Sequence, residues 1–66
     1  MHVTANGKQM EIAEATNVTT LLESLGMNCQ RVAVERNRAI VLREHFGNTL
    51  LQDGDQLEIV QFVGGG

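Results

Sequence analysis

Apolar and polar residues alternate at the start of the chain, and this pattern predicts a β-hairpin over residues 1–12. The dipeptide Asn6-Gly7 lies midway and favours a type I′ turn, because both central residues of that turn need a positive φ. Alternation with a period of two puts every second side chain on one face of the hairpin. The residues on the apolar face are Met1, Val3, Ala5, Met10 and Ile12.

The hydrophobic period then changes, and it predicts one short helix. Thr16 or Asn17 can accept hydrogen bonds from the free amides at its start, and Gly26 suits the left-handed position just past its end. The apolar residues recur at positions i, i+3, i+4 and i+7, so they form one stripe. They are Val18, Leu21, Leu22 and Leu25.

Three more strands are predicted after the helix, at residues 32–35, 39–42 and 57–63. Between them, residues 43–52 are irregular, and we expect a turn of helix followed by a loop. The compact solution is a mixed sheet of about five strands with the helix across one face, an α+β fold. In this arrangement the last strand runs parallel to the first strand, beside it in the centre of the sheet.

Length and composition limit what such a chain can do. Sixty-six residues make one small domain, which we place at residues 1–63, and one cysteine excludes an internal disulfide. A net charge of −3 argues against nucleic acid or an anionic membrane as the main partner. The chain shows neither a signal-peptide pattern nor a long apolar run, so we expect it in the cytoplasm. Its core is too small to enclose a substrate pocket as well, so an enzyme acting alone is not expected.

The strongest functional signal is the end of the sequence, Gly64-Gly65-Gly66. We expect a flexible tail here, since glycine has no Cβ and its ordering costs the most entropy. Three residues reach at most about 10 Å, enough to pass a narrow slot in another protein and deliver a terminal carboxylate. The alternative is a frayed end without function.

The last strand supplies a second signal. If Leu57 and Ile59 face the helix, alternation places Val60 and Phe62 on the opposite face, where they would form an exposed partner-binding surface. The alternative is that strand twist or a loop covers Phe62.

Other chemistry-bearing residues give weaker signals. Cys29 is interpreted as a small buried hydrophobe in preference to a nucleophile or persulfide carrier. His2 and His45 lie far apart without further ligands, and Asp53-Gly54-Asp55 lacks the later glutamate of a calcium loop, so no metal site is expected. A local group of basic residues is expected to be a solvated face, with contact to an acidic partner as the alternative: Arg36, Arg38 and Arg43.

Taken together, the segments resemble the ThiS family of thiamine-biosynthesis sulfur carriers over the whole length. The chain departs from the family's pattern at Leu42, often proline, and at Phe46, often a larger aromatic residue; both departures bear on loop packing. The matching segments are Asn6-Gly7, Val18…Leu21-Leu22…Leu25, Val34-Glu35-Arg36-Asn37…Ile40-Val41…Arg43, Leu51 to Val60, and Phe62 to Gly66.

The resemblance implies a ubiquitin-like β-grasp fold and the role of a protein cofactor. A ThiF-like adenylyltransferase would use ATP to adenylate the carboxylate of Gly66, and a sulfur-donating enzyme would convert it to a thiocarboxylate (1-thioglycine). A ThiG-like thiazole synthase would then receive the sulfur. Gly64 and Gly65 would occupy the partner's active site, and the chain itself would bind no cofactor.

Three alternatives remain. One is the small subunit of molybdopterin synthase, MoaD-like, which uses the same tail chemistry on the same fold. The others are a ubiquitin-like protein modifier and a binding module with an inert tail. The short length and the segment 53–60 favour the thiamine carrier.

Overall fold

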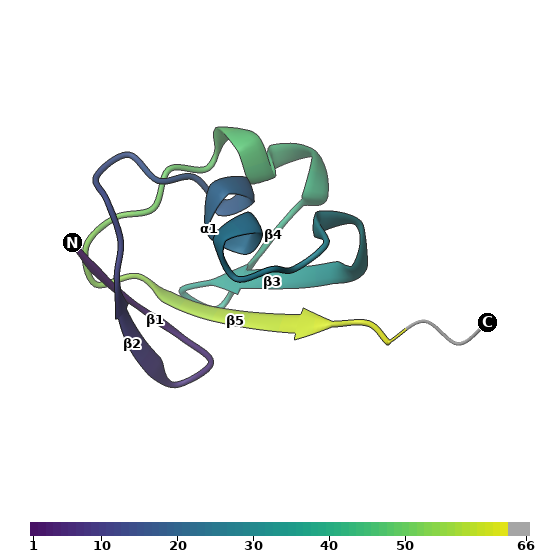
Figure 1. Cartoon of the computed structure of the whole chain (residues 1–66), viewed down its shortest axis with the longest axis horizontal. Helices are drawn as coiled ribbons and strands as arrows, with labels where there is room; N and C mark the ends of the chain where they lie inside the picture. Colours follow the sequence, from purple (N-terminus) through teal and green to yellow (C-terminus); the bar gives the residue numbers. More distant parts are fainter. Residues whose placement is uncertain (64–66) are drawn as a thin grey trace.

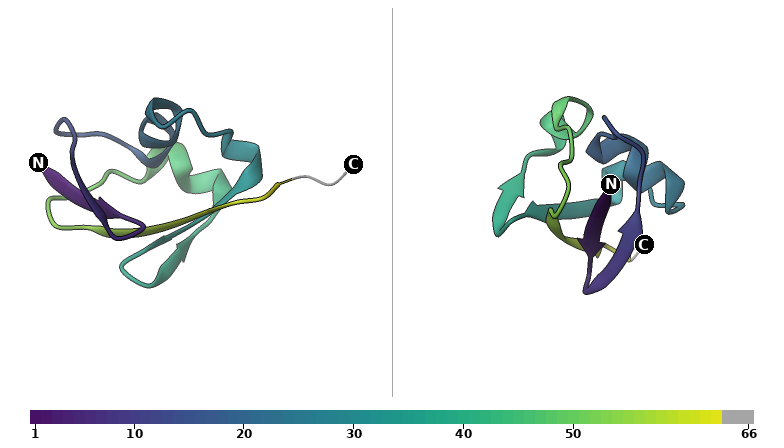
Figure 2. Two further views of the ribbon diagram at one scale, coloured as in Figure 1. Left: turned by 60° about the horizontal axis from the view of Figure 1, so that its bottom comes forward. Right: turned by 90° about the vertical axis from the view of Figure 1, so that its left-hand side faces the viewer.

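The computed structural model describes residues 1–63, and the predicted glycine tail, residues 64–66, lies outside the described residues. One mixed sheet carries a helix and two short 3-10 helices on one face (Figures 1 and 2). In chain order the elements are β1 (His2–Ala5), β2 (Lys8–Glu11), α1 (Val18–Ser24), η1 (Cys29–Arg31), β3 (Val32–Arg36), β4 (Ala39–Val41), η2 (Arg43–Asn48) and β5 (Gln56–Gln61).

The strand order is β2-β1-β5-β3-β4, with β5 in the centre. β5 runs parallel to β1, where Thr4 pairs with Gln56, and antiparallel to β3, where Val34 pairs with Ile59. The predicted mixed sheet, with its last strand parallel to the first, is therefore confirmed. β5, the last strand of the chain, is therefore held in the centre of the sheet by hydrogen bonds to a strand on each side.

Both hairpins turn through two residues with positive φ. Asn6 and Gly7 have φ of 51° and 80°, as the type I′ turn requires. The second hairpin turns at Asn37 and Arg38, with φ of 52° and 72°. β4 ends at Val41, so the predicted strand is one residue too long.

Local hydrogen bonds fix both ends of α1. The side chain of Asn17 accepts from the Thr20 amide at 2.7 Å, which decides between the two predicted caps. At the other end, Gly26 has φ of +73° and its amide donates to the carbonyl of Glu23 at 3.0 Å. The amide of Met27 donates to the carbonyl of Leu22 at 2.9 Å. These two bonds form a Schellman motif and satisfy carbonyls that the helix end leaves free.

The core lies between the sheet and the helices. Val18, Leu21 and Leu22 of the predicted apolar stripe are buried, whereas Leu25 is 37% exposed. The reason is that α1 stops at Ser24 and Leu25 is its C-cap, at the margin of the core. No helix within residues 1–63 is long and apolar enough to cross a membrane. The other buried apolar residues are Val3, Val32, Val34, Phe46, Leu51, Leu57 and Ile59.

A buried carboxylate, Asp55, ties the second hairpin to the loop before β5. It accepts hydrogen bonds from Arg36 Nε at 2.8 Å, from Asn37 Nδ2 at 3.0 Å and from the Gln52 amide at 2.8 Å. Burial raises the pKa of Asp55, but the bonds from Gln52, Asn37 and Arg36 outweigh it, so the pKa lies below its ordinary value. Asn37 Oδ1 also accepts from the Gln56 amide at 2.9 Å. The turn predicted at residues 53–55 is therefore also an anchor for β5.

This network predicts a pH-dependent stability that depends on Asp55. Because the pKa of this carboxyl is lower in the folded state, its stabilisation is complete above the ordinary pKa of 3.8 and is lost as pH falls through the folded value. Urea unfolding between about pH 5 and pH 2 should show the free energy of unfolding falling with pH in the wild type. In Asp55→Asn that slope should be markedly smaller.

The matched control is Glu14→Gln, at an exposed carboxylate in the segment between β2 and α1, which should keep the wild-type slope. An Asp55→Asn protein with an unchanged slope would contradict the role assigned to Asp55.

Candidate functional site

The last residues of β5 lead out of the sheet with their side chains exposed. The chain continues past the tip of the β1–β2 hairpin to Val63, which is 96% exposed (Figure 1). Val60 and Phe62 are 56% and 53% exposed, whereas Leu57 and Ile59 are buried. The predicted alternation is confirmed in its geometry, and no loop covers Phe62. A role of Val60 and Phe62 in partner binding stays a prediction.

The outer face of the sheet extends this exposed apolar surface onto β3 and β4. Ala33 of β3 is paired with Val60, and extending the β3–β4 register by one residue brings Leu42 opposite Ala33. We call this surface the outer patch, and its residues are Ala33, Ile40, Leu42, Val60 and Phe62. Ile40 and Leu42 are 73% and 52% exposed, and sequence reasoning missed both. The signal was available, because Val41 packs on the core and its two neighbours must point outward.

Two acidic residues border the outer patch. Glu35 and Glu58 are directly opposite each other on β3 and β5, and both are exposed. Like charges in this position destabilise a sheet. Neither carboxylate has an ion-pair partner within residues 1–63, where the ion pair is that of Arg36 with Asp55. The patch therefore presents an apolar surface with a negative border.

Arg38 and Arg43 of the predicted basic group are exposed, as expected of a solvated face, whereas Arg36 is half-buried. Arg36 is paired with Asp55, and Arg43 donates from Nε to the Cys29 carbonyl at 3.0 Å and from Nη2 to the Val32 carbonyl at 3.1 Å. Both guanidinium groups thus bind the protein itself, because the fold brings the buried carboxylate of Asp55 to Arg36 and two backbone carbonyls to Arg43. Arg38 remains in the exposed turn. Cys29 is half-buried and packs against the core, close to the hydrophobic role predicted for it.

The other candidate ligands do not come together. His2 and His45 are both exposed. Among the described residues, no group of three or more His, Cys, Asp and Glu side chains could hold a metal ion. The carboxylate of Asp55, the second aspartate of Asp53-Gly54-Asp55, instead accepts hydrogen bonds from Arg36, Asn37 and Gln52.

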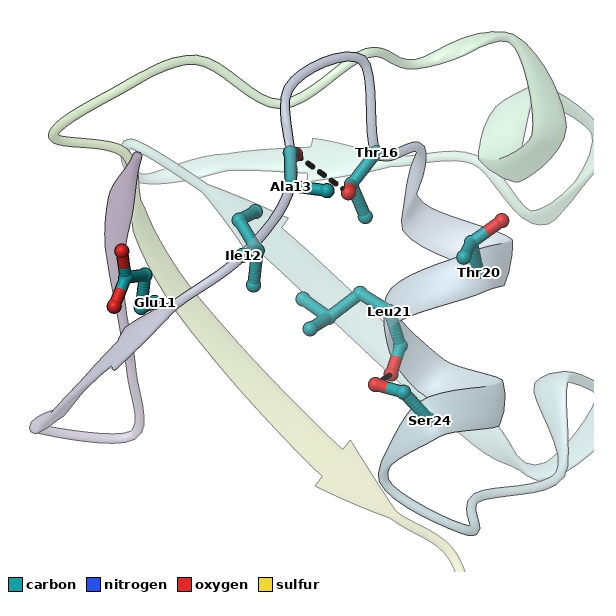
Figure 3. A pocket seen from close by; sticks show the side chains of 7 residues that line it. All are labelled: Glu11, Ile12, Ala13, Thr16, Thr20, Leu21 and Ser24. Atoms are coloured by element: carbon teal, nitrogen blue, oxygen red, sulfur yellow. Dashed lines mark hydrogen bonds between the residues drawn. The ribbon is translucent and has the colours of Figure 1, made fainter.

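A shallow hollow of about 210 Å³ lies between the end of β2 and α1 (Figure 3). The hydroxyls of Thr16 and Ser24 donate to backbone carbonyls of their own segments, each at 2.7 Å. The amino group of Met1 donates a hydrogen bond at 2.9 Å to the carbonyl of Ile12, one of the residues that line the hollow. The hollow therefore lies near the N-terminus and away from the end of β5 (Figure 1). The volume is below the roughly 300–1,000 Å³ of usual small-molecule sites.

Comparison with known proteins decides the family. The sequence model of the ThiS family matches residues 3–66. The chain belongs to the ThiS family. Two of its relatives, from Escherichia coli and Bacillus subtilis, are named sulfur carrier protein ThiS.

Relatives and a solved structure agree with this assignment. The chain is 35% identical to the sulfur carrier protein ThiS of Escherichia coli over 66 residues, which cover 100% of both chains. It superposes on the crystal structure of a thiamine biosynthesis protein (ThiS) from Geobacter metallireducens with a TM-score of 0.84, at 42% identity and full coverage of both chains. The β-grasp fold of this ThiS-family chain is thereby confirmed.

The chain also matches part of a longer protein. It is 42% identical over 66 residues to a thiazole synthase of Magnetococcus marinus. The chain spans about a fifth of the length of this relative, 20%, and the same share of a second thiazole synthase, from Paramagnetospirillum magneticum.

The alternation along β5 predicts that truncation destabilises the protein more at Ile59 than at Phe62. Ile59→Ala should lower the free energy of unfolding by about 2–5 kcal/mol, because it leaves a cavity in the core. Phe62→Ala, on the outer patch, should cost less than about 1 kcal/mol. Chemical denaturation measures both values. Equal losses for the two variants would mean that Phe62 belongs to the core.

Proposed function

We propose that this ThiS-family chain carries sulfur as a thiocarboxylate on the C-terminal carboxylate of Gly66. The observation that carries the proposal is the course of β5, which leaves the sheet with exposed side chains and leads directly into the sequence Gly64-Gly65-Gly66. The family match, which extends to residue 66, supports it. Without side chains, Gly64 and Gly65 suit a narrow entry into a partner's active site.

The chemistry needs activation from outside the chain. A carboxylate is ionised at neutral pH and is a poor electrophile. In the proposed reaction a carboxylate oxygen of Gly66 attacks the α-phosphorus of ATP, and pyrophosphate leaves. Hydrosulfide (HS⁻) released by a sulfur-donating enzyme then attacks the acyl carbon, the bond from that carbon to the AMP oxygen breaks, and AMP leaves. Loss of the sulfur-bound proton gives the thiocarboxylate. The sequence contains no Gly-x-x-x-x-Gly-Lys loop, so a ThiF-like adenylyltransferase is proposed to hold the ATP.

The proposed acceptor of the sulfur is a ThiG-like thiazole synthase. The similarity of this chain to part of two proteins named thiazole synthase supports that link. We place these reactions in the cytoplasm. Neither nucleic acid nor a membrane is a partner in this proposal, and the chain binds no cofactor itself.

The outer patch is proposed as the surface that the adenylyltransferase recognises. Val60 and Phe62 of the patch lie on the segment that leads to Gly66, so binding there would bring the carboxylate toward the ATP site. Its apolar centre would be desolvated in the complex. The uncompensated pair Glu35 and Glu58 predicts Arg or Lys side chains facing it on the enzyme.

ATP-dependent sulfur loading tests the proposal. The chain is incubated with a ThiF-like adenylyltransferase, a sulfur-donating enzyme and a heavy-sulfur donor, with and without ATP. We expect labelled sulfur on Gly66 with ATP, and none without it. Exchange of oxygen for sulfur adds about 16 Da, as does oxidation of methionine or cysteine, so the label must be located in the peptide 44–66, which contains neither residue.

Two variants are the controls for this assay. Cys29→Ser should load normally, because the sulfur is carried on Gly66, and deletion of Gly66 should abolish loading without unfolding the domain. Label on Cys29, or on Gly66 without nucleotide, would refute the carrier mechanism. Gly66 in an amide bond to a lysine of another protein would establish a modifier instead.

Val60→Ser and Phe62→Ser should weaken binding to the adenylyltransferase, with the larger effect, about tenfold or more, at Phe62. The physical reason is the loss of apolar area from the centre of the proposed interface. Calorimetric titration of folded variants measures the affinity. Leu50→Ser is the matched control, since Leu50 is 55% exposed but lies outside the outer patch. Equal affinities for Phe62→Ser and Leu50→Ser would exclude the outer patch from the interface.

A further inference from the structure

The pairing of β5 with β1 stops before β5 itself ends. The last backbone bond on this side runs from the Asn6 amide to the Leu57 carbonyl, at 2.9 Å. The side chain of Asn6 then takes the place of one more strand residue. Its Nδ2 donates to the Ile59 carbonyl at 2.9 Å, and its Oδ1 accepts from the Ile59 amide at 2.7 Å. The β1–β2 hairpin turns at Asn6 and Gly7, so β1 does not continue beside the part of β5 that follows Ile59.

Alternation leaves the next backbone groups on this side without a strand beside them. Successive residues of a strand direct their N–H and C=O groups to opposite edges, so Gln61 and Val63 point to the same side as Ile59. The backbone of Phe62, the residue between them, points to the opposite side, since its amide donates to the Arg31 carbonyl on the β3 side at 2.7 Å. Within residues 1–63, no strand lies beside Gln61 on the β1 side (Figure 1). We call residues 61–63 on this side the open edge.

A second hollow, of about 220 Å³, lies on the helix side of the sheet, and Ile59, two residues before the open edge, is among the residues that line it. Leu25 and Met27, which follow α1, line it, and this explains the partial exposure of Leu25. The volume is below the roughly 300–1,000 Å³ of usual small-molecule sites, so it suits a single side chain. Its other walls include Met10 and Ile59, with Lys8 and Asn6 also lining it.

We infer that an extended segment of the adenylyltransferase adds to the sheet as a strand along the open edge and places one apolar side chain in the hollow beside Leu25. Free N–H and C=O groups in a row are satisfied by a peptide backbone, which defines the chemistry of the occupant. The inference rests on the proposed function, in which the residues directly after Val63 enter this enzyme. In that function the enzyme is therefore the macromolecule next to the end of β5.

Such pairing would set how deeply the tail enters the enzyme. A strand added to Gln61 fixes the register of the backbone that continues to Gly66, and a slip of one residue would turn every side chain to the other face. The register would thus determine where the carboxylate stands relative to ATP. The outer patch lies on the face of β5, whereas the open edge lies on its flank, so the two contacts are separable by mutation.

Gln61→Pro and Gln61→Ala form the matched pair that tests this inference. Proline removes the N–H of Gln61, which bonds to nothing on β3, and it is tolerated where a strand's N–H side faces solvent. Both variants should keep a melting temperature close to that of the wild type. Gln61→Pro should bind the adenylyltransferase about five- to tenfold more weakly than Gln61→Ala, the effect of one lost hydrogen bond and its disturbed neighbour. Equal affinities would overturn the inference.

Amide hydrogen exchange of the wild-type protein gives a measurement that does not depend on the folding of a variant. The Gln61 amide should exchange more slowly when the adenylyltransferase is bound. If it exchanges equally fast in the free and bound protein while ATP-dependent loading of Gly66 proceeds, the added strand is wrong and the proposed function stands. Protection of Gln61 without enzyme, in step with dimer formation by sedimentation, would assign the open edge to a second copy and overturn the inference.

Discussion

Pairing of β5 on both of its flanks is the constraint on which the rest of the structure depends. β3 pairs with it at five positions and β1 at two, and the strand lies in the middle of the sheet. Its inward residues Leu57 and Ile59 complete the core under the helix, and its outward residues form much of the outer patch. Because the same strand leads to the glycines, the contacts that hold it also set where the chain's end leaves the domain.

Polar side chains hold this strand in register where backbone pairing alone would not. Asp55 organises the loop before it, and Asn37 binds the first amide of the strand. Asn6 binds both backbone groups of Ile59 and extends the short parallel pairing with β1. A buried carboxylate and two amides thus fix the register of the strand, a role that apolar packing fills poorly because it is not directional.

This arrangement suits a protein whose chemistry is supplied by its partners. In the proposed function the chain contributes one carboxylate, and its folded part serves recognition and positioning. The outer patch and the open edge lie on different sides of the same strand, and both end where the glycines begin. Recognition and delivery are therefore mechanically linked through β5, with no need for a conformational change in the domain.

The features that the sequence determined by itself are local ones. Asn6-Gly7 specifies a turn with two positive φ values, a cap at Thr16 or Asn17 and Gly26 mark the two ends of the helix, and a period of two sorts the side chains of β5. Each of these depends on neighbours within a few residues, so the pattern alone predicts it. The glycine end and the family resemblance likewise need no structure.

Long-range contacts decided the rest. Asn6 and Ile59 are 53 positions apart, and Asp55 and Arg36 are 19 apart. No local pattern therefore shows that the side chain of Asn6 extends the pairing of β1 with β5, or that Asp55 binds Arg36 of the predicted basic group. Leu25 fits the helical stripe but lies at the margin of the core, because α1 ends before it. Ile40 and Leu42 join Val60 only because β3 lies between their strands. These outcomes depend on which strands meet and in what register, and tertiary packing settles both.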